Sequence, residues 1–180
     1  NMLVADRRKL LNGNSFRLGV SGSGKSFSAK EEIVDLALST EDDILILDPE
    51  SEFASLVEAL NGEVIRISAT SDTHLNALDM DSAYGNDRNP LIEKSEFILS
   101  LFEQLVGAGN LSAKEKSILD RCTADVYRDY MRGGYQGQVP TLKDLYRQLM
   151  LQPEEEARGL ALSSELFING SLNTFAQETN

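Results

Sequence analysis

The chain has 180 residues, of which 41% are hydrophobic and 26% charged, as in an ordinary soluble globular protein. No apolar run approaches the roughly 20 residues that span a bilayer, and the charged N-terminal residues do not read as a secretory signal. The net charge of −12 argues against a broad nucleic-acid-binding surface, because neutralising phosphates requires clustered Lys and Arg. We therefore expect one core, or a core with an appended lobe.

The first 85 residues have the pattern of an α/β protein. In chain order we expect a strand, a helix, a strand, a helix and a strand, at residues 15–20, 25–38, 44–47, 51–60 and 63–67. The run at 44–47 is continuously apolar, which is typical of a parallel strand covered on both faces. The second helix is stopped by Asn61-Gly62. This order, with short connections, predicts a parallel sheet with right-handed crossovers.

The pattern becomes helical from Pro90 onward. Apolar spacing and capping signals predict four helices, at residues 91–106, 112–131, from 141 and at 153–167. Ser112 and Glu115 have the spacing of a capping box. We expect an α/β core at residues 1–85, an α-helical insertion at 86–168 and a return into the core at 169–180. Three strands are few for a doubly wound sheet, so the core is expected to be incomplete in this chain.

A phosphate-binding loop is the strongest chemical signal. Residues 19–26 read Gly-Val-Ser-Gly-Ser-Gly-Lys-Ser and match the pattern G-x-x-x-x-G-K-[ST] at every fixed position. Glycines allow positive φ values and close approach of the backbone to phosphates. Successive backbone N–H groups then form an anion-binding nest, to which the following helix adds its positive N-terminal end.

These residues predict binding of ATP or ADP with Mg²⁺. Lys25 would reach the β and γ phosphates and stabilise their charge, and the Ser26 hydroxyl would be a magnesium ligand. The expected nucleotide-binding residues are Gly19, Ser21, Gly22, Ser23, Gly24, Lys25, Ser26 and Phe27.

Two carboxylates follow the apolar run at 44–47. Asp48 superficially resembles the Walker B aspartate that organises magnesium in such enzymes. A second interpretation places Asp48 and Glu50 in a turn that lines the mouth of the site, as candidate catalytic residues. In a third, Asp48 caps the helix that begins near Ser51.

Four other residues have side chains that take part in catalysis in many enzymes. His74 is the only histidine and lies in a polar loop, where a catalytic role is not favoured. Arg128 and Arg132 are interpreted as a solvated helix face rather than as an arginine finger. Cys122 excludes an internal disulfide, fits a reduced compartment and is interpreted as a small helix residue rather than a reactive thiol.

An ordered series of motifs resembles the large ATPases of conjugative type IV secretion systems, the TraC/TrbE-like group of VirB-type transfer ATPases, especially those of integrative conjugative elements. The series comprises residues 19–30, 46–50 with Glu52-Phe53, 62–65 with Ile67-Ser68, and 74–80. Residues 5–11 and 170–175 also look like that family. The resemblance covers almost the whole chain, and the combination is far more specific than the phosphate loop alone.

The resemblance implies a P-loop NTPase core of the RecA/FtsK/HerA type, interrupted by an all-α lobe. In that family the Walker B carboxylates follow the lobe, so the general base is expected beyond Asn180 and Asp48 becomes an end-of-strand residue. The implied protein is a cytoplasmic motor ATPase that acts at the inner membrane with other secretion components, and in which hexamers are common. We expect this chain to bind nucleotide but to hydrolyse it poorly.

The chain departs from the family in three loops. Asn76-Ala77-Leu78 stands where Asn-Pro-Leu is common, Ser51 replaces a glycine, and Asn12-Gly13-Asn14 replaces Asn-Pro-Asn. Other hypotheses are a P-loop kinase acting on a small molecule, a non-catalytic nucleotide sensor, and an FtsK/HerA-type DNA translocase. The acidic composition disfavours the last and predicts no direct nucleic-acid binding by this chain.

Overall fold

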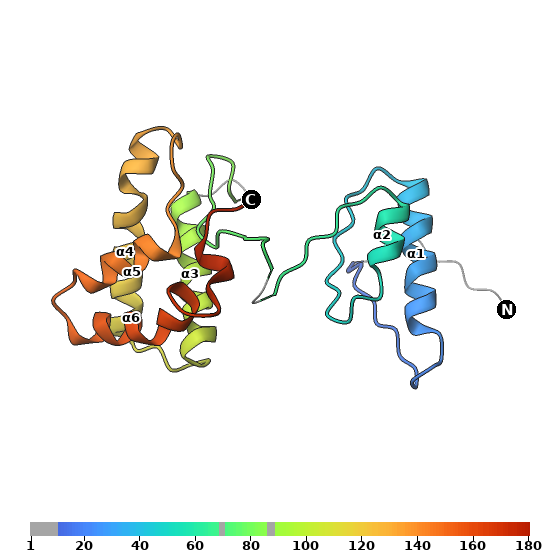
Figure 1. Cartoon of the computed structure of the whole chain (residues 1–180), viewed down its shortest axis with the longest axis horizontal. Helices are drawn as coiled ribbons and strands as arrows, with labels where there is room; N and C mark the ends of the chain where they lie inside the picture. Colours follow the sequence, from blue (N-terminus) through green and yellow to red (C-terminus); the bar gives the residue numbers. More distant parts are fainter. Residues whose placement is uncertain (1–10, 69–70, 86–88) are drawn as a thin grey trace. The chain divides into compact units, whose positions relative to one another are not determined.

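A computed structural model describes residues 11–68, 71–85 and 89–180. The chain divides into two compact units, Asn1–Val64 and Ile65–Asn180, which we call the P-loop unit and the helical unit (Figure 1). Of the family-like segment at residues 5–11, only Leu11 lies within the described residues.

The P-loop unit contains two helices, α1 at Lys25–Ser39 and α2 at Ala54–Ala59. Helix α1 agrees with the helix expected at 25–38. Helix α2 is shorter than expected at its N-terminal end, because residues 48–53 form a turn closed by Asp48. At its C-terminal end Asn61 takes the left-handed conformation with φ 58°, and the Gly62 amide donates to the Val57 carbonyl at 2.8 Å. The Asn-Gly pair therefore ends α2 as the sequence predicts.

The predicted parallel sheet is not confirmed. None of the described residues forms a strand, and the segments at 15–20, 44–47 and 63–67 run as loops in Figure 1. Their apolar side chains are largely exposed, with Leu18, Leu45 and Leu47 at 93%, 90% and 88%. An apolar run indicates that a segment tends to be buried. A strand also needs a neighbouring strand that pairs with its backbone N–H and C=O groups. That neighbour is not found among the described residues.

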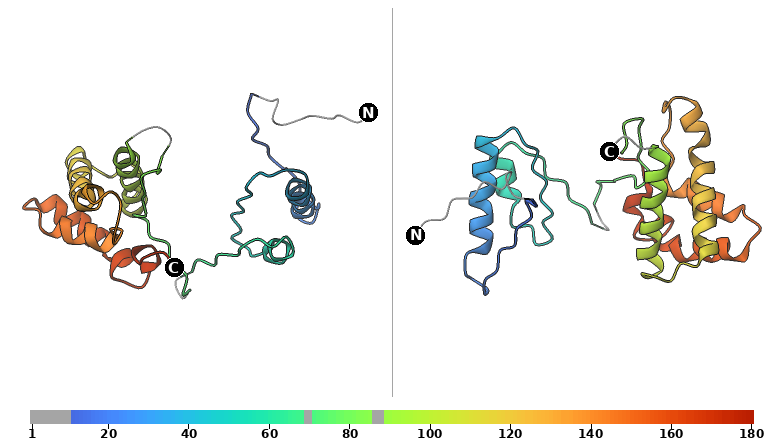
Figure 2. Two further views of the ribbon diagram at one scale, coloured as in Figure 1. Left: turned by 90° about the horizontal axis from the view of Figure 1, so that it is seen from above. Right: turned by 180° about the vertical axis from the view of Figure 1, so that it is seen from behind.

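The helical unit agrees with the helices expected from the sequence (Figure 2). Its elements are α3 at Pro90–Val106, α4 at Ala113–Arg132, α5 at Leu142–Met150, α6 at Glu155–Ile168 and the 3₁₀ helix η2 at Asn173–Ala176. Local signals place the helix starts. Ser112 and Glu115 form the predicted capping box at α4, and Thr141 with Asp144 forms another at α5.

Helix α4 lies at the centre of the helical unit, where it packs against α3, α5 and α6. Large side chains with no more than 1% exposure fill the space between these helices: Phe102, Leu119, Tyr127, Leu145, Leu149 and Leu160. Apolar residues at helical spacing lie on one face of a helix. The pattern that predicts the helices therefore also predicts which face of each helix packs against the others. Within the described residues, none of the helices combines the length and the apolar character needed to cross a bilayer.

Cys122 is part of this core. Its side chain is fully buried in α4, and burial raises the pKa of the thiol to about 11. A buried thiol with a raised pKa has little thiolate at neutral pH and is a poor nucleophile. The structure supports the interpretation of Cys122 as a packing residue.

This environment makes Cys122 a reporter of unfolding. At pH 8 we expect the folded chain to react with a disulfide reagent at least about tenfold more slowly than the same chain in denaturant, because thiolate formation and access are both suppressed. Absorbance of the released thiolate measures both rates. Equal rates in the two states would contradict the burial of this side chain.

Candidate nucleotide-binding site

The phosphate loop has the backbone geometry of an anion-binding turn. Gly22 and Gly24 have φ values of 76° and 84°, which residues with a Cβ rarely adopt. The Ser23 amide donates to the Val20 carbonyl at 3.2 Å and closes the turn. A Cβ at Gly19 would come within 2.3 Å of the Ser23 hydroxyl oxygen, so a larger residue there would require the Ser23 side chain to move. The sequence pattern and the observed backbone therefore agree.

The first turn of α1 leaves backbone amides without protein acceptors. The first bond of the helix runs from the Ser28 amide to the Gly24 carbonyl at 2.9 Å, so the amides of residues 25–27 have no acceptor within the helix. Gly24 is the N-cap and has no side chain to accept from them. No acceptor for these amides is found elsewhere among the described residues. A helix start of this kind is suited to binding phosphate.

Lys25 folds its side chain back over the loop. Its Nζ donates to the carbonyl oxygens of Gly19 and Val20 at 2.8 and 2.9 Å. The ammonium group is therefore held against the backbone at the first two residues of the loop. A phosphate oxygen could replace either carbonyl as an acceptor, and a hydrogen bond between two charged groups is stronger than one to a neutral carbonyl.

Two contacts join the segments on either side of the loop to other parts of the P-loop unit. Arg17, which precedes the loop, forms an ion pair with Glu32 of α1. Lys30 of α1 lies 5.3 Å from the ring centroid of Phe53, at the start of α2. These contacts join the segment before the loop to α1, and α1 to α2.

The Asp48 carboxylate closes the turn that leads to α2. The Phe53 amide donates to its Oδ2 at 2.8 Å. This bond is the main reason that the pKa of Asp48 lies below the usual aspartate value, since it stabilises the charged form. Helix α2 begins at Ala54 with Phe53 as its N-cap and without a side-chain cap hydrogen bond, so Asp48 closes the turn before the helix rather than capping the helix itself. The proposed roles of Asp48 in magnesium binding or catalysis stay predictions, as does the role of Glu50, whose side chain is exposed in the same turn.

The turn also accounts for one departure from the family pattern. Ser51 has φ 56°, in the left-handed region where glycine is favoured. A glycine would adopt this conformation without steric cost, which gives a physical reason for the residue that is common in the family.

The contact between Asp48 and Phe53 predicts an acid-dependent loss of order. The native pKa of Asp48 is lowered, so its contribution to stability is complete above the unfolded value of 3.8 and is lost as pH falls through the native value. We expect the Asp48 carboxyl resonance to titrate below pH 3.8, together with the Phe53 amide shift. In Asp48→Asn the amide titration should vanish. A midpoint above 3.8 would contradict the hydrogen bond.

Other sequence candidates lie in the helical unit. The His74 backbone donates to the Asn180 side chain at 2.8 Å, and its Nδ1 is buried without a partner among the described residues. Arg128 forms an ion pair with Asp125, and Arg132 lies 3.8 Å from Asp129. Both arginines are exposed, as the solvated-face interpretation expects.

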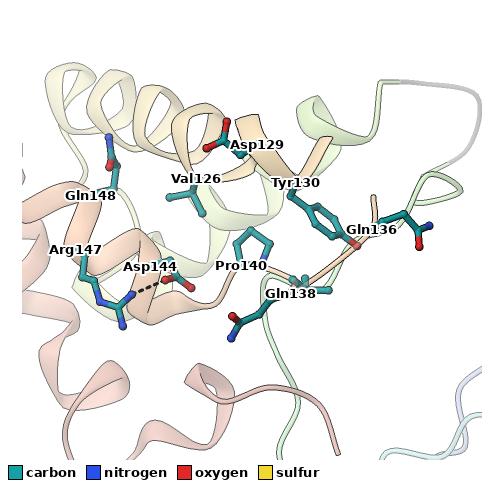
Figure 3. Close-up of a pocket in the computed structure, with 10 residues that line it drawn as sticks. Val126, Asp129, Tyr130, Gln136, Gln138, Pro140, Asp144, Arg147 and Gln148 are labelled. Carbon is teal, nitrogen blue, oxygen red and sulfur yellow. Dashed lines mark hydrogen bonds and ion pairs between the residues drawn. The ribbon is translucent and has the colours of Figure 1, made fainter. Parts of the chain in front are cut away.

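The structure also shows a hollow that the sequence did not indicate. It has a volume of about 520 Å³ and lies between α4, α5 and the connection before α5 (Figure 3). It is lined by Val126, Asp129, Tyr130, Gln136, Gln138, Val139, Pro140, Asp144, Arg147 and Gln148. Asp144 is paired with Arg147 at 2.7 Å, so this carboxylate has a partner within the wall. The sequence gives no sign of this hollow, because its lining residues come from separate segments that share no motif.

Comparison with known proteins assigns the class. The family model for the central domain of the helicase HerA matches residues 18–177, and the chain belongs to that family. Among solved structures, VirB4 of Thermoanaerobacter pseudethanolicus matches with a TM-score of 0.72 and 24% identity, over 99% of this chain and 49% of that one. No curated protein matches.

The chain thus has the fold of the corresponding part of VirB4 and spans about half the length of that solved structure. The resemblance to type IV secretion ATPases stated from the sequence is confirmed at the level of family and fold.

Proposed function

We propose that this chain is the ATP-binding part of a motor ATPase that energises type IV secretion or conjugative transfer. The observation that carries the proposal is the set of acceptor-free amides at residues 25–27, with the Lys25 ammonium held against the start of the loop. Membership of the HerA family and the VirB4 fold support the same function. By analogy with this fold, residues 1–85 and 169–180 would belong to the ATPase core and residues 86–168 to an inserted lobe.

In the proposed complex, the loop amides and the amides of residues 25–27 bind phosphate oxygens. Lys25 exchanges its two carbonyl acceptors for the β and γ phosphates. Ser26 lies exposed in the first turn of α1, where its hydroxyl could serve as one magnesium ligand while phosphates and water supply the others. Magnesium, when bound, would neutralise charge that develops on the transferred phosphoryl group.

Calorimetry with ATP and Mg²⁺ tests this proposal. We expect binding by the full chain, and Lys25→Ala should weaken it by roughly tenfold to hundredfold, the range expected for loss of a hydrogen bond to a charged group. Lys30→Ala is a matched control, since Lys30 lies on α1 but contacts the Phe53 ring. Absence of binding by the wild type, or equal loss in both variants, would contradict the proposed site.

We also propose that this chain alone hydrolyses ATP slowly. Asp48 is engaged by the Phe53 amide, so its carboxylate is committed to closing a turn. Phosphate release should therefore be close to the rate without protein, and Asp48→Ala should leave it unchanged. Rapid turnover that Asp48→Ala abolishes would assign the Walker B role to Asp48.

Assembly and location remain parts of the proposal. Action in the cytoplasm at the inner membrane, contacts with other secretion components and a hexamer of the whole protein are all inferred from the likeness to VirB4.

A DNA translocase is the second candidate, because the matching family is named for a helicase. Stimulation of the whole protein's ATPase by double-stranded DNA would favour it. The net charge of −12 predicts no DNA binding by this chain at physiological salt.

A further inference from the structure

Residues 74–80 carry a family-like motif that the proposed nucleotide site does not use. They lie in the helical unit as an irregular segment, and their buried residues alternate: Asn76, Leu78 and Met80 are 8%, 0% and 2% exposed. A buried segment outside regular structure cannot take its hydrogen bonds from its own helix or sheet. Its backbone groups must therefore be satisfied by other parts of the chain.

Its carbonyl groups are bound by side chains of α3 and α4. Lys94 donates to the Ala77 carbonyl at 3.4 Å, Tyr127 to that of Leu78 at 2.5 Å, and Tyr130 to that of Met80 at 3.1 Å. Lys94 is itself only 3% exposed and lies over the rings of Tyr84 and Phe97. Two helices thus hold one side of the segment.

Its amide groups are bound by residues in and after η2. The amide of His74 donates to the Asn180 side chain at 2.8 Å, that of Asn76 to the Thr179 hydroxyl at 2.9 Å, and that of Ala77 to the Phe175 carbonyl at 3.2 Å. The Asn180 amide returns a bond to the His74 carbonyl at 3.4 Å. The two segments therefore run side by side in opposite directions.

Asn76 joins these contacts to a third part of the helical unit. Its side-chain oxygen accepts from the Leu78 amide at 3.0 Å, which shapes the segment locally. Its side-chain nitrogen donates to the Pro140 carbonyl at 2.9 Å, in the connection before α5. The Asn76 side chain thus supplies partners for the Leu78 amide and the Pro140 carbonyl, which would be costly to bury without a hydrogen bond.

We propose that residues 74–80 and 174–180 form a clasp that closes the helical unit and opens as one cooperative element. Thr174 extends the clasp to the Ser68 carbonyl at 3.2 Å, close to the start of the helical unit. A displacement of the chain at Ser68 would consequently reach α3, α4 and residues 174–180 together. This inference does not depend on nucleotide binding.

Residue-resolved amide hydrogen exchange of the full chain tests the clasp. Thr179 is exposed, so Thr179→Val removes the acceptor of the Asn76 amide while it preserves side-chain shape. We expect the amides of His74, Ala77 and Asn180 to exchange about tenfold faster together with that of Asn76, because cooperative units open as a whole. Thr40→Val is the matched control: it loses a hydroxyl bond to the Leu36 carbonyl in α1 and should leave the clasp amides unchanged.

A second substitution tests the same clasp from its buried side. Asn76→Ala should accelerate exchange in both segments, whereas Asn110→Ala, which removes an exposed bond to the Val106 carbonyl, should not. Faster exchange confined to the Asn76 amide in Thr179→Val, or to the Leu78 amide in Asn76→Ala, would overturn the proposal. Unchanged exchange of Asn180 in both variants would overturn it equally.

Discussion

Every buried backbone N–H and C=O group must find a partner, and this constraint organises the helical unit of the protein. Within a helix the backbone groups pair with one another, except at the two ends. The groups at helix ends and in irregular segments therefore need partners from elsewhere. In the helical unit, backbone groups of residues 74–80 are satisfied by lysine, tyrosine, threonine and asparagine side chains. In the phosphate loop, the amides that begin α1 are left open.

The open amides of the loop are tolerated because they are exposed to water rather than buried. In the proposed site these amides would bind an anion, since glycines at positive φ and the start of α1 present them without any side chain in the way. Lys25 is held against the start of the loop through two backbone carbonyls. If the proposed site binds phosphate in this arrangement, little ordering of the loop is needed on binding.

The motif at residues 74–80 was recognised from the sequence, but its structural role is visible only in the folded protein. The asparagine at position 76 is polar and sits in a segment with turn-like composition, which suggests an exposed loop. In the structure it is buried and contacts Pro140, far along the chain. Ala77 shows a related point, because its amide donates to Phe175 and the proline that is common in the family at this position could not make that bond.

By itself, the sequence determined the helices, their caps and the phosphate loop, because each of these depends on residues only a few positions apart. The capping box at Ser112 and Glu115 and the glycines of the loop have the structure that their spacing predicts. Only the tertiary structure decided whether the predicted strands form. A strand needs a second strand beside it to receive its backbone hydrogen bonds, and no local sequence pattern can guarantee that partner. The tertiary structure also decided the partners of Asn76, because hydrogen bonds of buried irregular backbone depend on which distant segments meet.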